Sequence, residues 1–187
     1  MSPDNSQYDL YRYHAYGSVQ PSYLKHIQLL LEELISRHRS GTIVDAGAGR
    51  GIYCNYLTLE GFKVVAQDTS PSAFDSIGDG VTPHYGDIRS LHIYPNIVLW
   101  HAKDVVVDHI PLEEFFSTAR QLSPVGALVM LTTLDRYQDR ELNRVPWTLG
   151  FEAIKKDSWT PTSSEELDDW YNIKNRTRRV IIYQRSR

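Results

Sequence analysis

The 187-residue chain is predicted to form one α/β domain, residues 1–187, built on a doubly wound, mostly parallel seven-stranded sheet with helices on both faces. Two observations predict it. Short apolar runs of strand length alternate along the chain with amphipathic stretches of helical spacing, the order that gives parallel strands joined by helices. The length also suits one domain with a substantial core, and no second domain is required.

The chain opens with a polar, tyrosine-rich segment, residues 1–20. It holds Tyr8, Tyr11, Tyr13 and Tyr16 within nine positions, with His14 among them. Two interpretations are open: an arm that packs on one face of the sheet, or an aromatic lid over a bound ligand.

A helix is expected to begin at Pro21, because apolar residues then recur at helical spacing and basic residues follow near its end. The apolar stripe predicted to face the core consists of Ile27, Leu30, Leu31, Leu34 and Ile35.

Seven segments have the apolar, β-branched character of strands. They are residues 42–44, 62–68, 81–87, 96–100, 126–133, 152–156 and 179–184. Further helices are predicted at 52–60, stopped by Gly61, at 111–122, and at 163–171. Cys54 should be a buried residue of the first of these.

The bulk composition excludes several classes of function. The net charge of −3 gives no general attraction to nucleic acid, so a small or neutral partner is favoured. Cys54 is the only cysteine, which excludes an intrachain disulfide and a cysteine-cluster metal site, and no metal is predicted. The first residues lack a basic segment followed by an apolar core, and no apolar run is long enough to cross a membrane. A cytoplasmic protein is expected.

The most informative stretch is residues 42–51, where a β-branched strand leads into Asp45 and then into Gly47, Gly49 and Gly51. Glycines let the backbone turn tightly and approach a ligand closely, and a following helix would offer free N–H groups. A nucleotide-like cofactor is therefore expected. The dinucleotide fingerprint needs a third glycine three positions after the second, but Ile52 stands there.

The alternate glycine spacing after Asp45 resembles motif I of the class I S-adenosylmethionine-dependent methyltransferases. The resemblance implies that Asp45 serves the amino group of the cofactor's methionine, while Tyr16 and the arm cover that end. It also implies a Rossmann-like methyltransferase fold whose last two strands form an antiparallel hairpin. An NAD-linked dehydrogenase is the weaker alternative, and an ordinary strand-to-helix connection is the plainest one.

Two later strand ends extend the resemblance. Asp68, 17 positions after Gly51 and followed by Thr69, lies near the roughly 20-residue offset of a ribose-binding acid. Its alternative role is to cap the next helix, but Ser70 and Pro71 would supply that cap. The pair Asp87 and Ile88 looks like the family's adenine-side motif, in which the carboxylate meets the adenine amino group and the next amide meets the ring.

The resemblance implies methyl transfer to a small-molecule acceptor. His101 directly follows the fourth strand and is a candidate proton acceptor, or else a histidine satisfied by a backbone carbonyl. His14 and His109 are competing bases. Amino-methylating DNA enzymes carry an Asn/Asp-Pro-Pro-aromatic motif where this chain has Trp100-His101-Ala102-Lys103, which disfavours methylation of a nucleobase amino group.

Two further alternatives stay open. The chain could bind S-adenosylmethionine without transferring its methyl group, as a non-methylating enzyme or a binding module. A basic run near the end of the chain is either a solvated strand edge or a site for a phosphorylated or nucleic-acid acceptor. It consists of Lys174, Arg176, Arg178, Arg179, Arg185 and Arg187.

Overall fold

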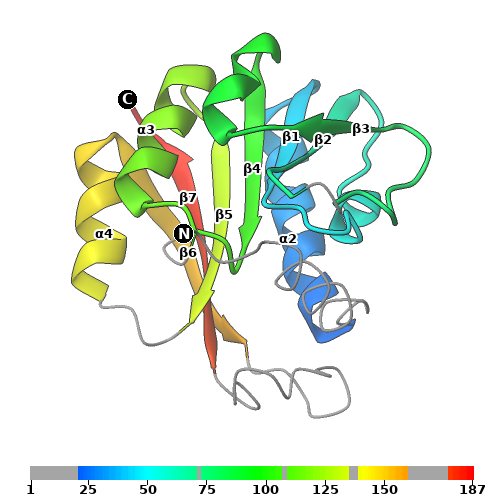
Figure 1. Ribbon diagram of the computed structural model, residues 1–187. Coiled ribbons are helices and arrows are strands. Elements are labelled where there is room, and N and C mark those ends of the chain that lie inside the picture. Colours follow the sequence, from blue (N-terminus) through cyan, green and yellow to red (C-terminus); the bar gives the residue numbers. More distant parts are fainter. Residues whose placement is uncertain (1–20, 71–72, 107–108, 135–138, 160–176) are drawn as a thin grey trace, which may run out of the picture.

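The computed structural model describes residues 21–70, 73–106, 109–134, 139–159 and 177–187. At its centre lies a seven-stranded sheet with the order β3-β2-β1-β4-β5-β7-β6 (Figure 1). The strands are β1 (Gly41–Ala46), β2 (Phe62–Asp68), β3 (Val81–Tyr85), β4 (Ile97–Lys103), β5 (Leu128–Leu134), β6 (Phe151–Trp159) and β7 (Arg178–Arg185). The predicted seven-stranded sheet is confirmed.

Strand direction also agrees with the prediction. The pairs β1–β2, β1–β4, β2–β3 and β4–β5 are parallel, whereas β7 runs antiparallel to both of its neighbours, β5 and β6. The order reverses direction at β1, so the carboxyl ends of β1 and β4 border the crevice where open α/β sheets bind ligands.

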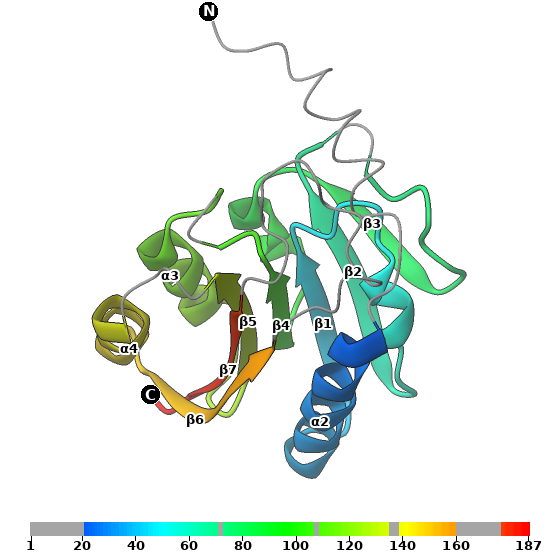
Figure 2. The same cartoon turned by 90° about the horizontal axis from the view of Figure 1, so that it is seen from below.

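Helices cover both faces of the sheet, as predicted (Figure 2). Helix α2 (Pro21–Arg37) lies on one side, and α3 (Leu112–Leu122) and α4 (Asp139–Thr148) lie on the other. Each side has its own buried cluster: Leu30 and Leu34 of α2 pack over β1 and β4, while Phe115 and Phe116 of α3 pack over the opposite face.

The buried stripe of α2 differs from the predicted one: Tyr23 joins it, Leu31 is only half-buried, and Ile35 lies outside it. Tyr23, Ile27, Leu30 and Leu34 are buried, but Ile35 is 44% exposed. The stripe advances by steps of three or four residues, and Ile35 lies one residue beyond it, about 100° round the helix.

The helix predicted at 52–60 is wrong in type and length. A short 3-10 helix, η1 (Tyr53–Tyr56), stands there instead. Thr58 Oγ1 donates to the carbonyl of Asn55, and the Asn55 amide bonds the backbone of Ser76 and Gly78. Such side chain to backbone bonds compete with helix propagation. Cys54 is buried as expected.

Four other elements differ from the prediction or lie outside the described residues. No helix follows Asp68 within residues 69–70 and 73–80, so the cap expected at Ser70 has no described helix to serve. Helix α4 and the 3-10 helix η2 (Ile88–Ile93) were not predicted. The helix expected at 163–171 lies outside the described residues.

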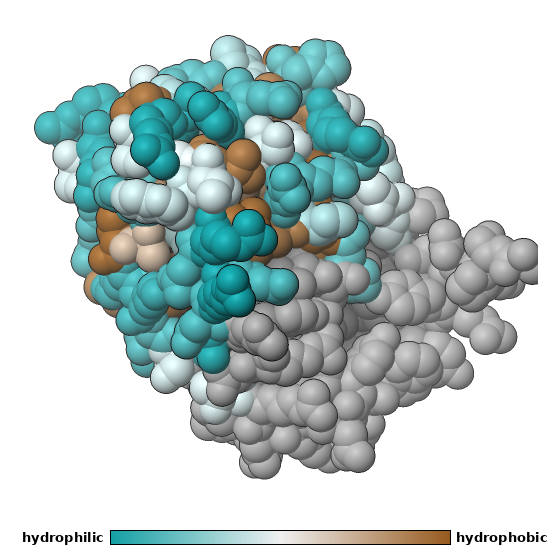
Figure 3. Space-filling model, turned by 90° about the vertical axis from the view of Figure 1, so that its left-hand side faces the viewer, coloured by the Kyte–Doolittle hydropathy of each residue, from teal (hydrophilic) through white to brown (hydrophobic). Residues whose placement is uncertain are grey.

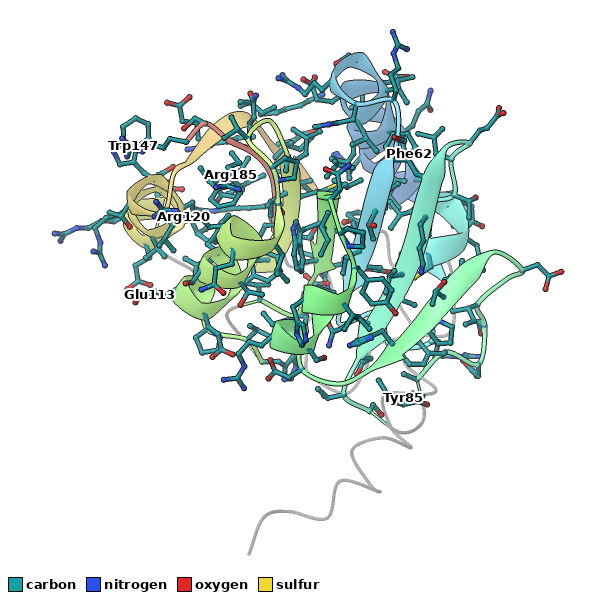
Figure 4. All side chains as sticks on the ribbon, turned by 90° about the horizontal axis from the view of Figure 1, so that it is seen from above. Phe62, Tyr85, Glu113, Arg120, Trp147 and Arg185 are labelled. Carbon is teal, nitrogen blue, oxygen red and sulfur yellow. The ribbon has the colours of Figure 1, made fainter. Side chains whose placement is uncertain are left out.

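The described part of the face that Figure 3 shows is mainly polar. On the side that carries α4, hydrophobic residues show as small, separate areas among hydrophilic ones (Figure 3). Two of the exposed aromatic side chains, Tyr85 at the end of β3 and Trp147 on α4, lie at opposite sides of the molecule (Figure 4).

None of the helices in the described part of the chain is long and apolar enough to span a membrane.

Removing the Phe116 ring should be costly. The ring is fully buried and meets the rings of Phe151 and Tyr183 with centroids 5.1 Å apart. Phe116→Ala should lower the free energy of unfolding by about 3–5 kcal/mol, as measured by denaturant titration. Val125→Ala, at a side chain 61% exposed, is the control and should change it by less than about 0.5 kcal/mol. Equal effects would contradict the assigned core.

Candidate cofactor and active site

The turn after β1 depends on left-handed backbone at three glycines. Gly47, Gly49 and Gly51 have φ of 66°, 54° and 79°. A Cβ at Gly47 would lie 2.4 Å from Val105 Cγ2, and one at Gly51 would lie 2.1 Å from Ile77 Cγ2. At Gly49 no heavy atom of the described residues lies within 4 Å. Two glycines therefore serve packing, and the middle one faces open space.

The Asp68 carboxylate lies directly against this turn. Its Oδ2 accepts a 2.8 Å hydrogen bond from the Gly49 amide, and its Oδ1 accepts a 2.8 Å bond from the Ser70 amide. Each carboxylate oxygen has a second lone pair, so Asp68 can still accept hydroxyl protons. Thr69, next to it, is exposed. The structure brings together the first two predicted features, the glycine turn and the acid of β2.

Sequence reasoning missed Gln67, which joins the turn to the end of β3. Its Oε1 accepts from the Gly47 amide at 3.2 Å, and its Nε2 donates to the Gly86 carbonyl at 2.6 Å. The available signal was a polar residue in an otherwise apolar run, and the side chain is only 2% exposed.

Asp87 and Ile88 begin the η2 helix. The Asp87 carboxylate accepts from the Arg89 amide at 2.9 Å and from its guanidinium at 2.7 and 2.9 Å. The hydrogen bond from the Arg89 side chain is the main reason that the pKa of Asp87 lies below its usual value. The Ile88 side chain is buried in the core, which leaves its backbone as the group for the predicted adenine contact.

Asp45 and His101 meet in the interior. His101 Nδ1 donates to Asp45 Oδ1 at 2.6 Å, and the Cys54 thiol donates to Asp45 Oδ2 at 3.1 Å. On the other side of the ring, Nε2 lies 3.0 Å from the Tyr23 hydroxyl, which lies 2.7 Å from Thr132 Oγ1. His101 is thus satisfied, but by side chains rather than by the backbone carbonyl of the alternative prediction.

Burial favours the protonated forms of Tyr23 and Cys54. It raises the pKa of Tyr23 well above its usual value, and, with the nearby charge of Asp45, it does the same for Cys54. Near neutral pH the phenol and the thiol are therefore both proton donors.

A charged cluster lies beside the tyrosines at the carboxyl ends of β4 and β5. Asp104 Oδ2 accepts from Lys103 Nζ at 2.9 Å and from Arg178 Nε at 3.0 Å. The Lys103 ammonium also lies 5.6 and 5.7 Å from the ring centres of Tyr23 and Tyr53. Asp104 has φ of 56°, and its Oδ1 is buried without a hydrogen-bond partner among the described residues.

Other predicted site residues lie elsewhere. His109 is exposed in the loop before α3. His14 and Tyr16 lie outside the described residues. Within the described ranges, no group of three or more histidine, cysteine or acidic side chains could hold a metal ion.

A family model described as a methyltransferase domain matches residues 17–171. The chain belongs to this methyltransferase family. Its fold is that of many solved structures, although no curated protein matches its sequence.

Three solved structures illustrate the likeness in fold. A putative sarcosine dimethylglycine methyltransferase from Galdieria sulphuraria is 12% identical, covers 98% of this chain and 99% of its own, and has a TM-score of 0.66. A geranyl diphosphate C-methyltransferase from Streptomyces coelicolor, solved with S-adenosyl-L-homocysteine, is 15% identical, with a TM-score of 0.64. The match covers 86% of this chain and 78% of that protein. The [4+2]-cyclase SpnF is 12% identical, with a TM-score of 0.65, and the match covers 87% of this chain and 80% of that protein.

The methyltransferase is class I, and its cofactor is S-adenosylmethionine. The described residues fit that group. Gly49 leaves space for a close approach of the ligand to the backbone, and the Asp68 carboxylate beside it can accept from neighbouring hydroxyls.

Alanine substitutions at Gly51 and Gly49 should have different effects, the first on folding and the second on cofactor binding. Alanine in left-handed backbone costs about 1–2 kcal/mol at either position, but Gly51→Ala also forces a clash with Ile77 and should unfold at a much lower temperature. Gly49→Ala should stay folded and bind S-adenosylhomocysteine about tenfold more weakly, or about 1.4 kcal/mol. Thermal unfolding and calorimetry measure both. Unimpaired binding by folded Gly49→Ala would contradict the assigned site.

Asp104 should make stability depend on acid pH. Burial acts to raise the pKa of Asp104, but the charges and hydrogen bonds of Lys103 and Arg178 outweigh it and hold that pKa below its usual value. The stabilisation is therefore complete above the unfolded pKa, about 3.9, and is lost as pH falls through the folded pKa.

Asp104→Asn should accordingly destabilise the protein by roughly 3–5 kcal/mol at neutral pH, and the difference from wild type should shrink below about pH 4. Melting temperatures across pH test this, with exposed Asp79→Asn as the control. A difference that is constant into the acid range would show that the charge of Asp104 is not the cause.

Proposed function

We propose that this enzyme transfers the methyl group of S-adenosylmethionine to a small-molecule acceptor by in-line displacement. The observation that carries the proposal is the hydrogen bond from the Gly49 amide to Asp68, which joins the glycine turn to the acid of β2 at one point of the sheet edge. When bound, the cofactor supplies an electrophilic methyl group on a sulfonium. Residues 1–187 would act as one domain, with residues 1–20 as the lid.

The residues around the turn have separate proposed roles in binding. Asp68, with Thr69, accepts from the ribose hydroxyls, because its carboxylate is fixed by two backbone amides and keeps free lone pairs. Asp87 accepts from the adenine amino group, with the Ile88 amide against the ring. Asp45 receives the methionine amino group, and Tyr16 covers that end.

Catalysis is proposed to depend mainly on holding the acceptor close to the methyl carbon and away from water. His101 and His14 are the proposed proton acceptors where the acceptor atom must lose a proton. For His101 the geometry favours an orienting role, because the side chain is fully buried and both ring nitrogens are already bonded to Asp45 and Tyr23.

A small acceptor is supported by two features. Two proteins of the same fold are named for small-molecule acceptors, sarcosine or dimethylglycine and geranyl diphosphate. The net charge of −3 gives no general attraction to a nucleic acid.

A second function has a specific observation behind it. The [4+2]-cyclase SpnF shares the fold, so this architecture also occurs in a protein that is named for a reaction other than methyl transfer. In that alternative the chain would use S-adenosylmethionine without donating its methyl group.

Product analysis separates the two functions. The enzyme is incubated with methyl-labelled S-adenosylmethionine and with small molecules that copurify with it, and products are identified by mass spectrometry. The proposal expects a labelled acceptor and one S-adenosylhomocysteine per methyl group transferred. An acceptor that is converted without label and without S-adenosylhomocysteine would establish the alternative.

Removing the Asp68 carboxylate should weaken cofactor binding. Charge-assisted hydrogen bonds contribute about 1.5–3 kcal/mol, so Asp68→Ala should raise the Kd for S-adenosylhomocysteine roughly tenfold or more. Calorimetry measures it, and Asp79→Ala, at an exposed carboxylate, should bind as wild type does. An unchanged Kd in folded Asp68→Ala would limit Asp68 to holding the backbone of the turn.

A further inference from the structure

Five side chains from five elements form one continuous hydrogen-bonded chain beneath the glycine turn. In order, they are Cys54 of η1, Asp45 of β1, His101 of β4, Tyr23 of α2 and Thr132 of β5. Their residues are all buried. Tyr23 comes from the α-helix α2, and sequence reasoning assigned no role to it.

The direction of the hydrogen bonds follows from the chemistry of the groups. A carboxylate can only accept, so His101 Nδ1 carries a proton and donates a hydrogen bond to Asp45. The Tyr23 and Thr132 hydroxyls can each donate or accept. Nε2 of His101 therefore has a matching partner whether or not it carries a proton itself.

The hydrogen bond with Tyr23 restricts a rotation of the His101 ring that the bond to Asp45 alone would allow. A single bond at Nδ1 lets the imidazole pivot about that contact, whereas a second bond at Nε2, on the other side of the ring, fixes its plane. Packing supports this: the Tyr53 ring lies 5.2 Å from the Tyr23 ring and 6.1 Å from the imidazole, centre to centre. A fixed imidazole in turn fixes the carboxylate it donates to.

We infer that Tyr23 is a positioning residue of the cofactor site: it holds His101, and through it the Asp45 carboxylate, in the orientation that receives the cofactor's methionine amino group. The inference rests on the proposed role of Asp45. Tyr23 itself does not touch the cofactor. Because coupling between two sites is reciprocal, cofactor bound at Asp45 also strengthens the docking of α2.

The test compares two buried tyrosines by calorimetric titration with S-adenosylhomocysteine. Tyr23→Phe should raise the Kd about two- to tenfold, the effect of one net hydrogen bond. Tyr183→Phe is the matched control, because its hydroxyl is equally buried and donates a 2.7 Å bond to the Leu142 carbonyl on the opposite face of the sheet. It should lose stability but bind as wild type does.

Two further readouts distinguish positioning from a general loss of stability. Nitrogen NMR of labelled histidine should show a shift of the His101 Nε2 signal in Tyr23→Phe and none in Tyr183→Phe. In a His101→Gln background, Tyr23→Phe should weaken binding no further, because the path to Asp45 is already broken.

The outcomes are distinct. If wild type binds and folded Tyr23→Phe binds equally well, or if its loss is undiminished in the His101→Gln background, the positioning role is overturned while the proposed function stands. If wild type does not bind S-adenosylhomocysteine, both fail. Should Tyr23→Phe not fold, Thr132→Val removes the neighbouring bond of the same hydroxyl. It should weaken binding about twofold, within the effect of a hydrogen bond, and an unchanged Kd would also overturn the role.

Discussion

The site depends on the steric constraint at Gly47, Gly49 and Gly51. Left-handed backbone at all three turns the chain sharply after β1, and the absence of side chains at the outer two lets Val105 and Ile77 pack against it. The segments that follow β4 and β2 are thereby drawn to the same point. Of the three, only the middle glycine has no neighbour among the described residues within 4 Å of a Cβ placed on it, so the motif combines two packing positions with one position for a ligand.

The acids at the strand ends share a sequence pattern but have different surroundings. Asp45 is buried and accepts from an imidazole and a thiol, whereas Asp68 accepts from two backbone amides, that of Gly49 in the glycine turn and that of Ser70 just after β2. Asp87 is paired with Arg89 near solvent. The first is oriented by side chains from other elements, the second by backbone amides, and the third by its own helix cap. Mutations at the three should therefore differ in their effects on folding and on binding.

The seven-stranded, mostly parallel sheet and the glycine turn were predictable because they depend on local patterns: apolar runs, glycine spacing and an acid at a strand end. The η1 region was not, because a helical pattern at 52–60 was overridden by side-chain bonds of Asn55 to a distant loop. Helix α4 was missed because it carries few buried apolar residues, Leu142 and Pro146, and contains a proline. The bond between Tyr23 and His101 was also hidden, because the two residues lie 78 positions apart in the sequence. The bond between Tyr23 and Thr132 was hidden for the same reason, since they lie 109 positions apart.

The account holds that the alternate glycines and the strand-end acids form a site for S-adenosylmethionine rather than for a dinucleotide. Calorimetric titration of the full chain with S-adenosylhomocysteine and, separately, with NAD tests this most directly. The account predicts saturable binding of S-adenosylhomocysteine at one site per chain and none of NAD. Saturable NAD binding, with no heat from S-adenosylhomocysteine, would contradict it.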